Sequence, residues 1–255
     1  MGKIIAIANQ KGGVGKTTTT VNLAAALAYL NKKILIVDFD PQANATQGVG
    51  AYNIGVNKNS YDLLFAEIHP KDVVKKLSIP PLSIIPATID LAGADLEMSE
   101  YKVGKEVILK NRLDMIRDDY DYILIDCPPS LGLLNTNAFT AADSVLIPVQ
   151  CEYYALEGLT QLLSTIRLVQ RLFNNKLIIE GVLLTMFDAR TNLSLEVQQE
   201  VRKYFKESTY ATHIPRSIRL SEAPSRGQTI FEYDVKSPGA MAYASLAKEV
   251  IKANE

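Results

Sequence analysis

The stretch Lys11-Gly-Gly-Val-Gly-Lys-Thr-Thr18 follows an apolar run from Ile4 to Ala8 and leads into a helical pattern from Thr17 to Leu30. The order strand, glycine-rich loop and helix is that of a phosphate-binding loop. Its three glycines allow successive backbone N–H groups to turn toward an anion. Lys16 can reach the β and γ phosphates, and the Thr17 hydroxyl can ligate Mg²⁺. The stretch therefore predicts binding of a nucleoside triphosphate.

The loop departs from the strict pattern at its first residues. That pattern has a glycine where this chain has Gln10, and a second lysine, Lys11, opens the loop. Lys11 cannot easily curl back onto its own phosphates, so it either points to solvent or reaches the nucleotide of a facing subunit. The nucleotide-binding residues of the predicted loop are Lys11, Gly12, Gly13, Val14, Gly15, Lys16, Thr17 and Thr18.

Composition limits the remaining possibilities. With 255 residues, of which 47% are hydrophobic, residues 1–255 can bury one substantial core, and we expect a single domain. The net charge of −1 gives no global attraction to nucleic acid or membrane, so any such partner must meet a local patch. The chain shows no signal peptide and no apolar stretch of membrane-spanning length, and we expect a soluble, intracellular protein.

Apolar runs alternate with helical patterns along the chain. Runs suited to buried strands are residues 4–8, 34–37, 82–85, 122–125, 145–149, 178–184 and around 210–214. The clearest helical patterns are 17–30, 156–173, 193–205 and 240–251. Residues 51–81 indicate short helices and loops. The alternation predicts an α/β fold, with a mainly parallel twisted sheet flanked by helices and its ligand beyond the carboxyl ends of the strands.

Three aspartates follow apolar strands, where they would approach the loop. Asp126 ends the run 122–125 and is placed to hold Mg²⁺, directly or through water, beside Thr17. Asp40 lies in a turn that ends at a proline and can move with the γ phosphate. For Asp38, spacing alone leaves two roles open: support of Mg²⁺ or retention of the loop.

Four further segments occur in order after the loop: Val37–Gln42, Ile125–Ser130, Pro148–Gly158 and Arg219–Ser225. Together with the loop they resemble the ParA/MinD ATPases, and the chain is most similar to the Soj-type (ParA) chromosome-partitioning branch. The resemblance runs nearly end to end. It implies a P-loop NTPase with a deviant Walker A motif, in the SIMIBI class, with ATP and Mg²⁺ as cofactors.

The resemblance also implies roles for single residues. Lys16 contacts phosphate, Asp40 positions the attacking water, and Lys11 crosses a dimer interface to the phosphates of the other subunit. Adenine would lie near Met186, Pro215 and Arg216, although core packing also explains Met186. The matching arginines for DNA binding are Arg190 and Arg219.

The implied cycle is an ATP-dependent homodimer that binds nonspecific double-stranded DNA and is reset by hydrolysis, which a ParB-like protein stimulates. The implied location is the cytoplasm, on the nucleoid, with no membrane contact. Between Met186 and Arg226 the seven basic residues exceed the acidic ones by only two, so charge alone would favour an ordinary solvated face. The resemblance extends to an influence on a replication initiator protein or on sporulation genes, for which the residues give no direct support.

Two alternatives share the loop. A membrane-bound division-site ATPase of the MinD type needs a basic amphipathic C-terminal helix, whereas the last helical pattern here has a core-facing stripe. A small-molecule kinase or ligase would need neither Lys11 nor DNA-binding arginines.

Overall fold

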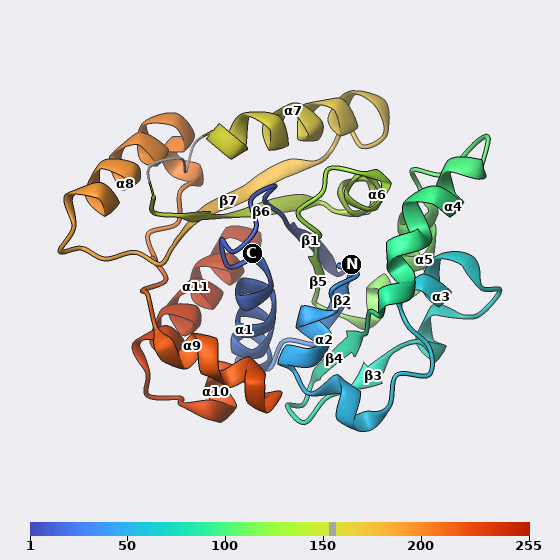
Figure 1. Cartoon of the computed structure of the whole chain (residues 1–255), viewed down its shortest axis with the longest axis horizontal. Helices are drawn as coiled ribbons and strands as arrows, with labels where there is room; N and C mark the ends of the chain where they lie inside the picture. The colour runs from blue at the N-terminus through green and yellow to red at the C-terminus, as the bar shows by residue number, and fades with distance from the viewer. Residues whose placement is uncertain (153–156) are drawn as a thin grey trace.

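The structure is a computed structural model that describes residues 1–152 and 157–255, built around one seven-stranded sheet (Figure 1). The strand order is β3-β4-β2-β5-β1-β6-β7. Strand β3 runs antiparallel to β4, and the other neighbours are parallel. The strands are β1 (Lys3–Ile7), β2 (Ile34–Asp38), β3 (Lys75–Lys76), β4 (Leu82–Ile85), β5 (Tyr122–Asp126), β6 (Ser144–Gln150) and β7 (Ile178–Thr185).

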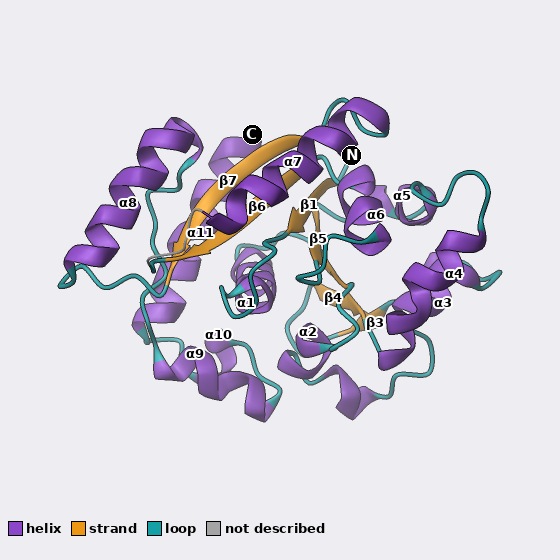
Figure 2. Ribbon diagram, turned by 45° about the horizontal axis from the view of Figure 1, so that its top comes forward, coloured by secondary structure: helices purple, strands orange, loops and turns teal. Residues whose placement is uncertain are grey.

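Helices cover both faces of the sheet (Figure 2). One face carries α1 (Lys16–Tyr29), α2 (Asn44–Gly48), α9 (Ile218–Glu222), α10 (Ile230–Tyr233) and α11 (Pro238–Asn254). The other carries α3 (Ser60–Phe65), α4 (Ala94–Glu100), α5 (Ile108–Asp114), α6 (Leu133–Ala141), α7 (Glu157–Leu172) and α8 (Asn192–Phe205). None of these helices has the length and apolar character needed to cross a membrane.

The apolar runs form central strands because both of their faces are buried. In β1, Ile5 and Ile7 pack into the core beneath α1 and α11, while Ile4 and Ala6 pack into the core on the opposite face. Alternate residues of a strand point to opposite faces, so a run without polar residues is needed to satisfy both cores. This arrangement confirms the predicted helix-flanked parallel sheet.

One predicted strand is wrong. Residues 210–214 touch β7 only near their ends, through N–H bonds from Tyr210 to Val182 and from Ile214 to Leu184. The backbone N–H groups between them, those of Ala211 and Thr212, donate instead to the carboxylate of Glu249, at 2.8 and 2.9 Å. The seventh strand is the short β3, within the segment predicted as short helices and loops.

The predicted helices are found with small shifts. Helix α11 starts at Pro238 rather than at residue 240, because Pro238 occupies the first turn and Ser237 Oγ accepts from Ala240 N. Helix α7 matches the pattern 156–173, whose first residue, Leu156, lies outside the described residues, as do Tyr153, Tyr154 and Ala155 of the Pro148–Gly158 segment.

The strand register brings the predicted site together. Asp38 at the end of β2 pairs in register with Asp126 at the end of β5, and Asp126 also pairs with Ile7 at the end of β1. The glycine-rich loop follows β1 at once. Two aspartates and the loop therefore meet at one edge of the sheet, as expected for parallel strands.

Candidate nucleotide-binding site

The glycine-rich loop is held open from both sides. Asn9 Nδ2 donates to Pro148 O at 2.7 Å, and Asn9 Oδ1 accepts from Lys11 N at 3.0 Å. Thr185 Oγ1 at the end of β7 donates to Val14 O at 2.8 Å. Gly13 lies in the left-handed region with φ of 76°, where a side chain would be strained, and no atom lies within 4 Å of the place a Cβ would take. The loop therefore presents bare backbone to the space in front of it.

The N-terminus of helix α1 places the positive end of the helix dipole behind the glycine-rich loop. No side chain caps its N-terminus, where Gly15 has φ of 89°. Its first N–H groups and the helix dipole therefore favour an anion in front of the loop. Lys16 Nζ donates to Lys11 O at 3.1 Å. Burial lowers the pKa of Lys16, and the carboxylates of Asp126 and Asp40 oppose that effect.

Asp126 is fully buried at the end of β5. Its Oδ1 accepts from Thr20 Oγ1 at 2.9 Å, whereas its Oδ2 has no hydrogen-bond partner among the described residues. Burial, followed by the nearby charge of Asp38, raises its pKa to about 8. An unpartnered buried carboxylate oxygen beside the start of α1 fits a cation site, with the Thr17 hydroxyl as a second oxygen donor.

Asp38 has a different environment from Asp126. Its Oδ2 accepts from Thr46 N at 2.7 Å and Thr46 Oγ1 at 2.6 Å, and its Oδ1 from Asp40 N at 3.3 Å. Burial raises the pKa of Asp38 to about 6, although the hydrogen bonds from Thr46 oppose this. Of the two roles left open for Asp38, these contacts favour retention of the loop and of α2.

Asp40 is buried yet lines the front of the site. Its Oδ1 accepts from Gln42 N at 3.0 Å, and its backbone carbonyl accepts from Ala43 N at 2.8 Å. Ala43 adopts a left-handed φ of 52°, so the turn that carries Asp40 is tight. Asp40 is therefore held by this turn and lines the same cavity as the glycine-rich loop.

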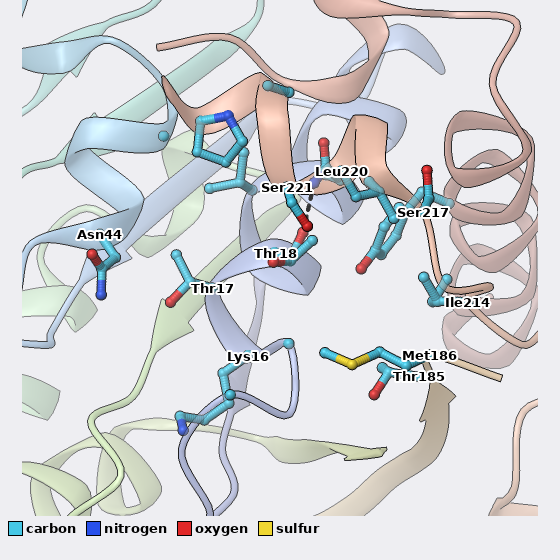
Figure 3. A pocket seen from close by; sticks show the side chains of 18 of the residues that line it. Lys16, Thr17, Thr18, Asn44, Thr185, Met186, Ile214, Ser217, Leu220 and Ser221 are labelled. Carbon is cyan, nitrogen blue, oxygen red and sulfur yellow. Dashed lines mark hydrogen bonds between the residues drawn. The ribbon is translucent and has the colours of Figure 1, made fainter. Parts of the chain in front are cut away.

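A cavity of about 910 Å³ opens in front of the loop. In Figure 3, Lys16 and Thr17 lie between Asn44 on one side and Met186 with Ile214 on the other. The three residues predicted to meet adenine, Met186, Pro215 and Arg216, all line this cavity. The loop residues Gly12, Gly13, Gly15, Lys16, Thr17 and Thr18 line it too. The cavity is therefore large enough, and has the polarity, for phosphates at one end and a base at the other.

The sequence did not identify the roof of this cavity. It is formed by α2 and by the turn at residues 223–228, with Gln47 and Gly48 on one side and Pro224, Ser225 and Gln228 on the other. Tyr243 of α11 closes the back, its hydroxyl 3.2 Å from Thr19 Oγ1. Periodicity could not have revealed these residues, because they come from short turns and from the buried stripe of a helix.

Six predicted residues are absent from the cavity lining: Lys11, Val14, Asp38, Asp126, Arg190 and Arg219. Val14, Asp38 and Asp126 are buried. Lys11 forms an ion pair with Glu152 of its own chain. Arg190 lies in the turn between β7 and α8, and Arg219 lies on α9; both are exposed. The structure thus brings the loop, the aspartates and the predicted base residues together, and places both arginines on the outer surface.

Comparison with known proteins gives a consistent result. Residues 2–179 match a protein family described as an AAA domain. The chain is 59% identical to the sporulation initiation inhibitor protein Soj of Bacillus subtilis, over 98% of each chain. It is 48% identical to the chromosome-partitioning ATPase Soj of Treponema pallidum, also over 98% of each. Among solved structures, cobyrinic acid a,c-diamide synthase of Mycobacterium smegmatis with bound ADP and magnesium matches with a TM-score of 0.86 and 35% identity, over 99% of this chain and 95% of that one.

Proposed function

The chain belongs to the Soj/ParA family of chromosome-partitioning ATPases, and we propose that it couples ATP hydrolysis to reversible binding of nonspecific DNA. Residues 1–255 would act as one ATPase domain. ATP would bring two subunits into a sandwich dimer that binds double-stranded DNA, and hydrolysis to ADP and phosphate would separate them. The observation that carries the proposal is the uncapped start of α1 behind a glycine loop, facing a cavity that ends at Met186 and Pro215.

The nucleotide would lie along this cavity. The backbone of residues 12–18 and the ammonium group of Lys16 would hold the phosphates. Thr17 and Asp126 would hold Mg²⁺, which neutralises phosphate charge when bound. Asp40 would orient the attacking water, since phosphoryl transfer depends mainly on positioning and charge stabilisation.

Lys11 would complete the site of the facing subunit. Two bound triphosphates repel each other across an interface unless cations lie between them. Lys11 would leave Glu152 and supply such a cation in trans, so that the dimer reports the presence of ATP. Loss of the γ phosphate would remove the negative charge that Lys11 contacts in the facing subunit.

Arg190 and Arg219 would contact DNA phosphates. Both follow closely on cavity residues: Met186 precedes Arg190 by four positions, and Arg216 precedes Arg219 by three. A dimer doubles the number of such contacts, so weak binding by each monomer becomes appreciable only with ATP. A ParB-like protein would stimulate hydrolysis, and the protein would lie in the cytoplasm on the nucleoid. An influence on a replication initiator protein is part of the same analogy.

The alternatives receive less support. For a membrane-bound division-site ATPase, α11 would have to present its apolar side to lipid, yet Tyr243, Leu246 and Val250 are buried in the core. The solved neighbour from Mycobacterium smegmatis is a cobyrinic acid a,c-diamide synthase, an enzyme of the small-molecule class, but the chain is more similar end to end to chromosome-partitioning ATPases.

A DNA titration tests the proposal. Nonspecific duplex DNA is titrated with ATP, ADP or no nucleotide over a series of salt concentrations, with Arg219→Glu as the control variant. Tight, salt-sensitive binding only with ATP, lost in Arg219→Glu, is the expected result. Absence of binding in every nucleotide state would refute the DNA-binding part and redirect attention to the ligase class.

A further inference from the structure

Arg219 is exposed, but its guanidinium group is paired with side chains of its own chain. Its Nη1 donates to Glu222 Oε2 at 3.0 Å, and its Nε lies 3.7 Å from Asp234 Oδ2. The ring of Tyr233 lies beneath the guanidinium group, 6.0 Å from Cζ to the ring centroid, and the Tyr233 hydroxyl donates to the same Glu222 oxygen at 3.0 Å. Glu222 therefore occupies the place at Arg219 that an anionic ligand would take.

Arg190 is held in the same way by a second carboxylate. Its Nε and Nη2 donate to the two oxygens of Asp188, at 2.9 and 2.7 Å, in a two-pronged pair. This is the geometry in which arginine also binds a phosphate. The hydrogen bonds from Arg190 lower the pKa of Asp188 to about 2, so the carboxylate is ionised at neutral pH.

The two pairs lie at the same end of the molecule. Phe187 and Pro215 form a parallel bridge, with Phe187 N donating to Ile214 O at 3.0 Å. From that bridge the chain reaches Arg190 in three residues and Arg219 in four, so the two arginines lie at most about 30 Å apart at ~3.5 Å per residue. In both ribbon views the connection to α8 and helix α9 lie at the same end of the molecule, next to β7, although α8 and α9 cover opposite faces of the sheet (Figures 1 and 2).

We propose that Asp188 and Glu222 compete with DNA phosphates for Arg190 and Arg219, and so set the DNA affinity of the protein. The inference rests on the proposed DNA binding and names what regulates that surface. DNA binding is then an exchange in which a phosphate replaces a carboxylate at each arginine. The exchange keeps each contact weak, so the DNA is released when the dimer separates.

The exposure of the four side chains limits the strength of this competition. Arg190 is 89% exposed and Arg219 55%, while Asp188 and Glu222 are 32% and 42% exposed. Ion pairs between side chains this exposed contribute little, so removal of one carboxylate should raise DNA affinity by up to about fivefold. A dimer contains each ion pair twice, so a single substitution should raise the DNA affinity of the dimer by at most about 25-fold.

The opposite role is also testable. If Glu222 and Tyr233 served mainly to orient Arg219 toward DNA, loss of the carboxylate would weaken binding. The two roles therefore predict changes of opposite sign in the same variant.

The experiment compares full-length Asp188→Asn, Glu222→Gln and the double variant with the parent protein, on nonspecific duplex with ATP. Asn and Gln keep an acceptor oxygen for the local hydrogen bonds and remove only the charge. Glu207→Gln is the matched control, because Glu207 is exposed in the same part of the chain and makes no ion pair with any described residue.

We expect tighter binding by both single variants, near-multiplicative tightening by the double variant, and a change of less than about twofold in the control. The slope of log affinity against log salt should stay the same, because the number of phosphate contacts does not change. Equal tightening by Glu207→Gln, or weaker binding by Glu222→Gln, would overturn the inference while the parent protein still binds DNA. A parent protein that binds no DNA with any nucleotide would overturn the proposed function itself.

Discussion

The roof of the cavity depends on a contact between two glycines, and Gly227→Ala tests it. Gly227 has φ of 62°, and a Cβ built there would lie 2.8 Å from Gly50 Cα and 3.2 Å from Gly50 N. The obstacle is backbone, which cannot swing aside as the end of a side chain can. Gly55 offers a control for backbone strain without collision, since its φ of 82° and ψ of 128° disfavour alanine while no atom lies within 4 Å of its Cβ position.

The expected magnitudes separate strain from collision. Alanine in the left-handed region costs about 1–2 kcal/mol at Gly227, whereas the conformation of Gly55, with φ of 82° and ψ of 128°, lies outside that region and costs alanine about 1–3 kcal/mol. Forced separation of the two backbones should add about 1–3 kcal/mol at Gly227 alone, as other overpacked sites do. We therefore expect a loss in unfolding free energy of about 2–5 kcal/mol for Gly227→Ala and about 1–3 kcal/mol for Gly55→Ala, so that nucleotide affinity is the sharper comparison.

Urea unfolding followed by circular dichroism measures both losses, with nucleotide-free protein. Nucleotide affinity is measured in parallel with a fluorescent ATP analogue, because Gln47, Pro224 and Gln228 all line the cavity and separation of the two glycines would move the segments that carry them apart. Gly227→Ala should bind the analogue more weakly, and Gly55→Ala should not. Equal stability and equal affinity of the two variants would refute the reasoning.

The remaining predictions concern charges at the site. Lys11→Ala should bind ATP yet stay monomeric by light scattering, and an ATP-dependent dimer of normal affinity would remove the trans role of Lys11. Asp40→Ala should retain ATP and accumulate as dimer, with phosphate release slowed on the order of 10²-fold or more; brisk release would reassign the positioning of water. Folding raises the pKa of Asp126 from the ordinary carboxyl value of 3.8 to about 8, so over this range the folded state binds more protons than the unfolded state. In EDTA and without nucleotide, the unfolding free energy should therefore fall as pH rises from 3.8 to about 8. Asp126→Asn should remove the part of this decline between about pH 6 and 8, while Asp38, whose pKa is raised to about 6, retains the lower part. An unchanged decline above about pH 6 would assign it to other groups.

The sequence predicted the parts of the site that follow the buried central strands β1, β2 and β5. The glycine loop, Asp126 and Asp40 are each placed by a buried strand whose run of apolar residues is easy to recognise, so their convergence followed from parallel topology. The contacts that assign Asp38 to Thr46 could not be predicted, because Thr46 lies on the five-residue α2, too short for any periodic signal.

The failed strand at residues 210–214 has a comparable cause. Its apolar pattern is compatible with a strand, but Glu249, almost 40 positions later, takes two of its N–H groups. Periodicity reports which residues are buried and says nothing about which distant side chain claims a backbone donor. Likewise, the sequence near Arg190 and Arg219 yields only a net charge, whereas the structure shows that Asp188 pairs with Arg190 and Glu222 with Arg219.

The bridge between Phe187 and Pro215 has a consequence for the spacing of contacts along DNA. Arg190 and Arg219 follow the two residues of this bridge by three and four positions, so both are tethered to one point at the end of the sheet. In the proposed dimer, the nucleotide would then set the distance between two such pairs of arginines, one from each subunit. Phosphates recur at fixed intervals along a duplex. Only some distances between the two pairs would therefore let all four arginines contact phosphates at the same time. ATP would thus select the register at which the protein fits DNA of any sequence.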